Sequence, residues 1–497
     1  MFEERKLHPI ALIKEIIVNV RQNIVPIFVG FFSAFQAIRN NGFLPMWLLV
    51  LILILLALLI LAPAFLKYMT YRYTLEAEGI RIKYGFVFRK NIYIPYERIQ
   101  TIQEKQWFFY IPFNVTQILI ETAGTKGKAE GDLSAVPKSV ATELRDLREG
   151  KREEKREEAA TIEENNLENP FDVPKIKESE KPIQTITLKT NQLLLMAVTS
   201  SGVLGGFVIL LALFGQFQEV IPDDLISESY DQIVKLGVFM FVILAILALL
   251  IMWGVSIVAT LFKYFQFKLK QFENHLEIEK GLLQRNHTTI RLERIQGVII
   301  TESPFRQMLG LVAVKLITAG SSGDKEHSGD ILMLPIMKKK EALTIIQDVL
   351  PQYHVPNEAL KHAPKSSLKR FIWIYFIWTI IPAIVASVLF YPLGFIALIL
   401  PALAVLKAIL SYRATGFHFA SGTVLFRSRP FLSKTSHLVR KERIQAMHVR
   451  QSVWMAKSKT NHIQIAIKSG NSSTAAYLRY LGDEQTTELY AWYRPES

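Results

Sequence analysis

The sequence predicts a membrane α-helical plus α+β fold class: six transmembrane helices form three hairpins, and a strand-rich domain closed by a C-terminal helix follows each hairpin. Two observations predict this architecture. Nearly the same segment, centred on Glu-Arg-Ile-Gln, occurs three times in the 497 residues. A pair of long apolar stretches precedes each copy, and such self-similarity is the signature of a repeated structural unit. We call each strand-rich domain a module.

Long uncharged runs place the predicted spans, because a helix needs about 20 mostly apolar residues to cross the hydrocarbon core. The clearest runs are residues 40–66, 190–218 and 236–262. Residues 371–406 are too long for one crossing and contain the turn signal Tyr391-Pro392-Leu393-Gly394, so we expect a tight hairpin of two short spans there. Residues 22–38 form the shortest run, and we expect it to cross because its partner needs a return path.

Lys and Arg near the span ends set the predicted orientation, because cytoplasmic flanks are enriched in them. The segments before the first and fifth spans and after the second and fourth are basic, whereas the short connections within each pair are poor in positive charge. We therefore expect a multi-pass protein of the plasma membrane, with the N- and C-termini and all three modules in the cytoplasm.

The same patterns divide the chain. Residues 1–21 are expected to be an amphipathic segment that lies on the membrane, since Leu12, Ile13, Ile16, Ile17 and Val20 share one helical face. The predicted hairpins are residues 22–66, 189–262 and 370–411, the predicted modules are residues 67–160, 263–352 and 412–497, and the predicted linkers are residues 161–188 and 353–369.

Each module is predicted to contain several antiparallel strands and one closing helix, which together make a small barrel or an orthogonal sandwich. In the third module, Ile463, Ile465 and Ile467 alternate with polar residues, as expected of a half-buried strand. The closing helices are expected at residues 138–160, 338–350 and 484–492.

Two spans followed by a strand-rich block with a central Arg-Ile-Gln and a terminal helix resemble the bacterial pleckstrin-homology (PH) domain membrane proteins of the YdbS/YdbT family, in their longer three-module form. The resemblance covers roughly nine-tenths of the sequence. It implies PH-like modules and a multi-pass membrane protein. It also implies a membrane-protein partner, for which a smaller one-module paralogue is the suggested candidate. The family brings no shared ligand or reaction.

The repeated motif supplies the candidate site residues. They are Glu97, Arg98, Ile99, Gln100, Glu293, Arg294, Ile295, Gln296, Glu442, Arg443, Ile444 and Gln445. Read as strands, the motifs place each Ile in the core, each Arg and Gln outward, and each Glu inward at the rim. The motif therefore either defines the fold or forms a shared docking surface.

Enzyme chemistry finds no support in the sequence. The chain has no cysteine, no complete phosphate loop and no His-Glu-x-x-His pattern. The His-containing segment 322–330 is rich in Gly and Ser and is expected to be a strand connection. We expect no catalytic residues, no metal site and no cofactor.

Net positive charge leaves three kinds of partner to weigh. The formal charge is +14, and juxtamembrane Lys and Arg favour weak attraction to anionic lipid headgroups over specific binding. The first and third modules carry basic clusters on their first hairpin, whereas the second carries Glu277, Glu279 and Lys280. Nucleic-acid binding is not expected, because the positive-inside topology explains most of the excess charge.

These features together predict a non-enzymatic membrane protein that presents three cytoplasmic modules as a protein- or lipid-interaction platform, with a role in envelope stress or antimicrobial-peptide resistance. The alternative is a membrane transporter or exporter subunit of a hetero-complex. The predicted span interiors have no ionisable residue, and transport sites usually need one.

Overall fold

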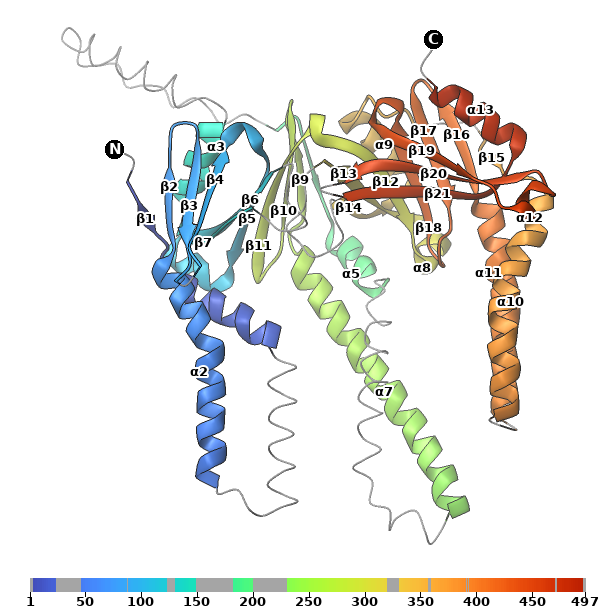
Figure 1. Ribbon diagram of the computed structural model, residues 1–497, viewed down its shortest axis with the longest axis horizontal. Coiled ribbons are helices and arrows are strands. Elements are labelled where there is room, and N and C mark those ends of the chain that lie inside the picture. The colour runs from blue at the N-terminus through green and yellow to red at the C-terminus, as the bar shows by residue number, and fades with distance from the viewer. Residues whose placement is uncertain are drawn as a thin grey trace.

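The computed structural model shows three modules side by side, with apolar helices that extend from one side of the row (Figure 1). It describes residues 3–23, 46–86, 88–122, 130–148, 182–199, 230–319, 330–355, 359–389, 391, 393–469 and 472–494. Most of the predicted spans 22–38 and 190–218 and much of the linker 161–188 lie outside these residues.

The three modules repeat the same order of elements. The first contains β1 (Arg5–Lys6), β2 (Arg72–Leu75), β3 (Gly79–Tyr84), β4 (Lys90–Pro95), β5 (Ile99–Trp107), β6 (Val115–Thr122), β7 (Gly131–Pro137) and α3 (Lys138–Arg148). The second contains β8 (Gln184–Thr187), β9 (Lys268–Gln271), β10 (His275–Lys280), β11 (Gln284–Arg291), β12 (Ile295–Glu302), β13 (Leu311–Thr318), β14 (Asp330–Lys338) and α9 (Lys339–Val349). The third contains β15 (Lys361–His362), β16 (Gly416–Ala420), β17 (Thr423–Ser428), β18 (Lys434–Arg440), β19 (Ile444–Arg450), β20 (Thr460–Ser469), β21 (Ser472–Gly482) and α13 (Asp483–Tyr493).

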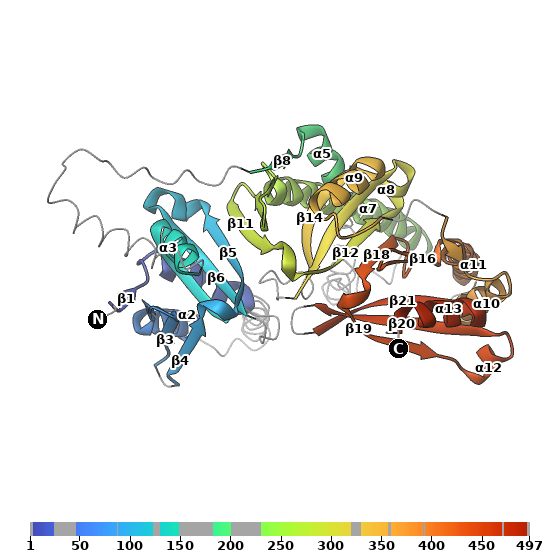
Figure 2. The ribbon, with the colours of Figure 1, turned by 90° about the horizontal axis from the view of Figure 1, so that it is seen from above.

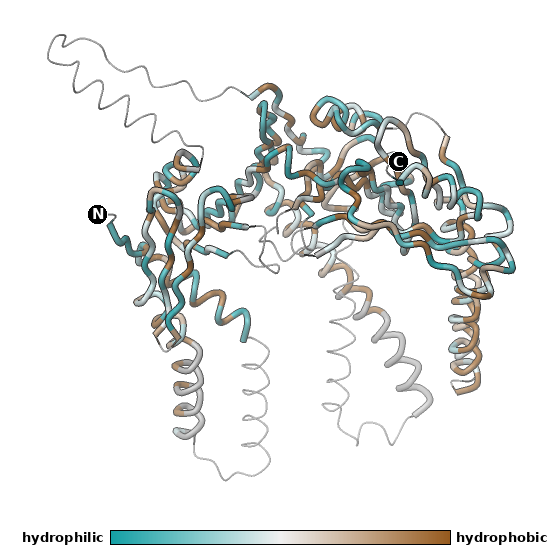
Figure 3. The backbone as a smooth tube through the Cα atoms, turned by 45° about the horizontal axis from the view of Figure 1, so that its top comes forward, coloured by the Kyte–Doolittle hydropathy of each residue, from teal (hydrophilic) through white to brown (hydrophobic). Residues whose placement is uncertain are grey.

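Apolar helices connect or flank these modules. They are α2 (Met46–Thr70), α5 (Thr190–Val198), α7 (Tyr230–Tyr264), α10 (Ser366–Leu389) and α11 (Ile399–Ala414). Within the described residues, two helices are long and apolar enough to cross a membrane, Ser366–Leu389 and Gly394–Ala414. They pack against each other as the predicted hairpin around Tyr391, which Figure 3 shows as a predominantly hydrophobic pair.

The hairpin does not simply precede its module. In each module, the first strand lies before the apolar helices in the chain and pairs antiparallel with the strand that follows them. The pairs are β1 with β2, β8 with β9, and β15 with β16. The predicted module boundaries began after each hairpin, so the structure adds one strand to each module and inserts the apolar helices between its first two strands.

Strand pairing joins neighbouring modules into continuous sheets. One seven-stranded sheet has the order β7-β6-β5-β11-β10-β9-β8, and a second has the order β14-β13-β12-β18-β17-β16-β15. Each therefore combines the second half of one module with the first half of the next. A four-stranded sheet, β1-β2-β3-β4, and a three-stranded sheet, β19-β20-β21, complete the two ends of the row. Figure 2 shows this row from above.

Hydrophobic cores follow the same pattern. Leu425 and Leu438 of the third module pack in the core of the second, while Ile299 and Ile317 of the second pack in the core of the third. The first module has a separate core that includes Leu7 and Ile10 from before the hairpin. The second and third modules are thus a single packed unit.

Several predicted elements agree with the structure. The closing helices α3, α9 and α13 follow the last strand of each module, as expected. Ile463, Ile465 and Ile467 on β20 are fully buried, which confirms their predicted inward face.

Residues 11–23 form a helix of the predicted amphipathic kind. Its apolar Ile13, Ile17 and Val20 are exposed. Its buried Lys14 and Glu15 instead anchor it to the first module: Lys14 Nζ lies 2.9 Å from Asp132 Oδ2, and Lys67 Nζ lies 2.9 Å from Glu15 Oε2. The helix therefore shows its apolar face away from the module.

Candidate functional site

The repeated motif forms the corner where one half of each module turns into the other. In the first copy, Glu97 and Arg98 belong to a 3-10 turn (Tyr96–Arg98), and Ile99 begins β5. The turns Leu292–Arg294 and Lys441–Arg443 repeat this arrangement. Ile99, Ile295 and Ile444 are buried, as predicted.

The predicted inward position of the glutamates is wrong. Glu97, Glu293 and Glu442 are exposed, because the 3-10 turn rotates them out of the strand alternation on which the expectation rested. After each Ile, the pairing with the following strand shifts register across the Gln position, which makes the Gln the extra residue of a β-bulge. The outward prediction for Gln holds for the exposed Gln445, whereas Gln296 is buried.

One motif also contacts another. Arg443 Nη2 of the third copy donates a hydrogen bond to the backbone oxygen of Glu293 in the second, at 3.1 Å. Tyr353, which is buried after the closing helix α9, donates its hydroxyl to the oxygen of Ile295 at 3.0 Å. The second motif therefore takes part both in closing its own module and in the contact with the next.

A cavity of about 520 Å³ lies where the first two modules join. Its basic lining residues are Lys138, Arg145, Lys268, Lys270, Lys280 and Arg285, and its acidic ones are Glu104, Glu277 and Glu279. Phe265 and Gln266, which follow the end of α7, complete one wall. The cavity is thus predominantly basic and adjoins the end of an apolar helix.

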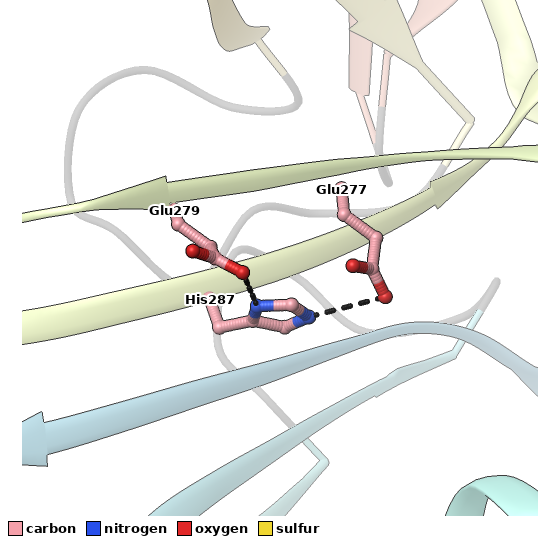
Figure 4. A group of neighbouring side chains, drawn as sticks. All are labelled: Glu277, Glu279 and His287. Carbon is pink, nitrogen blue, oxygen red and sulfur yellow. Dashed lines mark ion pairs between the residues drawn. The ribbon is translucent and has the colours of Figure 1, made fainter. Parts of the chain in front are cut away.

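Among the residues that line this cavity, the His287 imidazole lies between the carboxylates of Glu277 and Glu279 (Figure 4). His287 Nε2 is 3.4 Å from Glu277 Oε1, and His287 Nδ1 is 3.5 Å from Glu279 Oε1. Lys270 Nζ lies 2.6 Å from the same Glu279 oxygen. Neighbouring strands β10 and β11 position all three cluster residues, with Glu279 directly opposite His287 in the antiparallel register.

Electrostatics favour a charged imidazolium in this cluster. Burial lowers the pKa of His287, but Glu277 and Glu279 raise this pKa by more than burial lowers it. The pKa of His287 therefore lies above its ordinary value of 6.5. The hydrogen bond from His287 is the main cause that lowers the pKa of Glu279 to about 2. Burial raises the pKa of Glu277, but the nearby His275 and His287 rings outweigh burial and hold this pKa well below its usual range.

The three residues have the chemistry of metal ligands, and their ligand atoms lie within 4.8 Å of one another. In the structure, Glu277 approaches Nε2 of the ring and Glu279 approaches Nδ1. A doubly protonated imidazolium between two carboxylates has this arrangement.

A second repeated feature is a set of exposed apolar side chains next to the helix ends. We call it the apolar rim, and its members are Phe86, Phe88, Phe108, Phe113, Leu282, Leu283, Phe305, Met308, Phe431, Leu432, Val453 and Trp454. They occupy the hairpin tip between the third and fourth strands of each module and the connection between the fifth and sixth.

Hydrogen bonds tie the hairpin tips of the rim to the apolar helices in all three modules. The Gly85 N–H donates to Thr70 Oγ1 at the end of α2, at 3.1 Å. The Leu282 N–H donates to the Phe262 oxygen near the end of α7, at 2.8 Å. Ser411 Oγ near the end of α11 donates to the Arg429 oxygen at 3.4 Å. The tips thus share the level at which the helices leave the modules.

Comparisons with known proteins agree with this architecture. The family profile described as "Bacterial PH domain" matches residues 24–152, 228–352 and 376–497, one match per module. The chain belongs to the bacterial PH domain family. It is also similar to the "UPF0699 transmembrane protein YdbT" of Bacillus subtilis (strain 168), with 27% identity over 499 residues that cover 100% of this chain and 99% of that protein. The resemblance to the PH-domain membrane proteins is therefore confirmed, and neither description assigns an enzymatic activity.

Sequence reasoning missed the junction cavity. It compared the basic residues of each bacterial PH domain separately and set the second one aside because of Glu277 and Glu279. The cavity instead combines Lys138 and Arg145 of the first domain with basic residues of the second. Both acidic residues form ion pairs: Glu277 with His287, and Glu279 with His287 and Lys270.

The Glu-His-Glu cluster predicts a pH-dependent stability. Folding raises the pKa of His287, so the protonated ring stabilises the folded state. This stabilisation is fully present below the unfolded-state pKa near 6.5 and is lost as pH rises through the higher folded-state pKa. Thermal unfolding of the full chain in detergent should therefore show a melting temperature that falls as pH rises from about 6 to 8. In His287→Gln this fall should be smaller.

The exposed His354 provides the matched control. His354→Gln should keep the wild-type pH profile. A profile for His287→Gln that overlays the wild-type one would contradict the assignment of the charge to this cluster.

Proposed function

We propose that this chain is a non-enzymatic, multi-pass plasma-membrane protein that holds three cytoplasmic PH-like domains against the bilayer as an interaction platform. The observation that carries the proposal is the insertion of apolar helices between the first two strands of each module. The chain leaves the sheet after the first strand, passes through the apolar helices and returns to the same sheet at the second strand. This path attaches the module to the membrane at two points. Six spans, with both termini in the cytoplasm, agree with this insertion and with the basic flanks.

The apolar rim supports contact between the modules and the bilayer. Its side chains are strongly exposed, with Met308 at 85% and Trp454 at 73% of their full accessible area. Large apolar and aromatic side chains at the level of the helix ends suit the interfacial region of a membrane. The helix of residues 11–23, with Ile13, Ile17 and Val20 exposed, has the same character.

Lipid headgroups are the ligand class that the junction cavity fits. Six basic and three acidic residues line it, and it adjoins the end of α7. An anionic headgroup at the membrane surface would meet this basic excess without entering the domain core, and charge attraction of this kind is weak and sensitive to salt.

The biological role that we propose is protection of the cell envelope, through assembly of a complex with another membrane protein. The transporter alternative needs a hydrated path, and α10 has no Asp, Glu, His, Lys or Arg between Phe371 and Leu389. The platform therefore explains more of the described structure.

The placement of the rim predicts the accessibility of single cysteines, which are unambiguous because the chain has none of its own. Trp454→Cys should react slowly with a charged, membrane-impermeant maleimide in inverted membrane vesicles, because the bilayer shields it. Tyr490→Cys is the matched control, since it replaces an exposed aromatic residue on α13, on the far side of the module from α10 and α11 (Figure 1). It should react fast. Equal rates for the two variants would contradict the rim's contact with the bilayer.

The envelope role predicts a phenotype. Cells that lack the chain should be more sensitive than wild-type cells to a panel of membrane-active peptides, and expression of the intact chain should restore resistance. Indistinguishable growth of the deletion and wild-type strains across the panel would count against envelope protection while leaving the membrane placement untouched.

A further inference from the structure

The two internal junctions use the same strand edges in the same register. At the first, β5 pairs antiparallel with β11, and Ile102 is opposite Thr289. At the second, β12 pairs antiparallel with β18, and Val298 is opposite Leu438. Counted from the Glu of each motif, both pairs join the fifth residue after one Glu to the fourth residue before the next. The junction is therefore a repeating interface, like the modules themselves.

A repeating interface of this kind is heterologous, because it joins two different edges, and it leaves one edge unused at each end of the row. Among the described strands, β4 of the first module pairs only with β3, and β19 of the third pairs only with β20. These are the counterparts of β11 and β5. Figure 2 shows both at the outer margin of their modules.

We propose that β19 of one copy of this chain pairs antiparallel with β4 of a second copy, in the register of the two internal junctions. Applying that register places Met447 opposite Tyr93 and His448 opposite Ile92. Exposed strand edges are templates for such addition. The proposal goes beyond the platform function, since it describes how copies of the chain assemble with one another.

The facing residues resemble those of the internal junctions. The pair His448 and Ile92 mirrors Ile299 and His437 at the second junction. Likewise, Gln451 and Arg89 would repeat the pair Gln106 and Arg285 of the first.

Two features of these strand edges limit the stability of the proposed pairing between β19 and β4, which we call the joint. Pro95 cannot donate a backbone hydrogen bond, but it lies just outside the paired stretch, as do its counterparts Arg291 and Arg440. Arg450 would face Lys90, and like charges directly opposite each other weaken a strand pair. The joint between copies is accordingly weaker than the internal ones and is strengthened by salt.

Membrane geometry agrees with the joint. The two internal junctions leave the described apolar helices on one side of the row (Figure 1). A third junction of the same register keeps the helices of a second copy on that side, so that both copies share one bilayer. Successive joints close into a ring or continue as an open row, depending on the rotation at each joint.

Cysteine cross-linking between two differently tagged full-length copies tests the proposal. One copy carries Tyr93→Cys and the other Met447→Cys, and the two are expressed together and oxidised in native membranes. Adjacent residues of paired strands lie within disulfide range. We expect a covalent dimer that contains both tags and that neither variant forms alone. Ile102→Cys with Thr289→Cys in one chain is the internal positive control, which should close without forming a dimer.

Replacing Tyr93→Cys by Asn91→Cys shifts the pair by two residues and should abolish most of the dimer. No dimer with Tyr93→Cys and Met447→Cys, or equal yields for the shifted pair, would overturn the proposal. Arg450→Glu in the Met447→Cys copy should raise the dimer yield about twofold or more, because it turns a repulsive pair into an attractive one. An unchanged or lower yield would also contradict the assigned register.

Discussion

The pairing of one module's fifth strand with the next module's fourth is the interaction on which the rest of the structure depends. It converts three small sandwiches into a row of two seven-stranded sheets with a short sheet at each end. Since every buried strand needs its backbone groups paired, neither internal junction can open without exposing two strand edges. The pairing also places the apolar helices of successive modules on one side, which is the condition for a shared bilayer (Figure 1).

The two junctions share a register but differ in chemistry. At the second, Val298 faces Leu438, and side chains of each module fill the core of the other. At the first, Glu104 faces His287 and Lys105 faces Asn286, and the basic cavity lies beside the strands. Apolar burial contributes most to the second junction, although β18 also carries the buried His437 there. The charged groups beside the first junction make it responsive to protons and salt. We infer that the first module is the more adjustable part of the chain.

Much of this architecture can be predicted from the sequence, because it depends on local patterns. The apolar hairpin near Tyr391, the closing helices and the inward Ile residues of β20 follow from length, periodicity and turn chemistry. The strands before each hairpin were missed because they are short, with two residues in β1 and β15 and four in β8, and because they lie far from their partners in the chain. The exposed Glu97 was misplaced because a 3-10 turn interrupts the strand alternation.

Contacts between modules could not be predicted in the same way. A strand's own sequence sets which face is buried, but it does not say which edge pairs with which neighbour. For this reason the junction cavity was also missed, since Lys138 and Glu277 come from different modules and meet only through β5 and β11. The internal repeat was the one signal in the sequence for contacts between modules. It predicts the pairing at one junction only once the register of the other junction is known.

Hydrogen–deuterium exchange of the full-length chain in a membrane mimic tests the shared sheets most directly. The informative amides are those of β11 and β18 that point toward the preceding module. If the sheets are continuous, these amides exchange as slowly as the amides that β11 and β18 direct toward β10 and β17 in their own modules. Exchange at the rate of an unpaired strand edge would contradict the account and leave three separate modules on one chain.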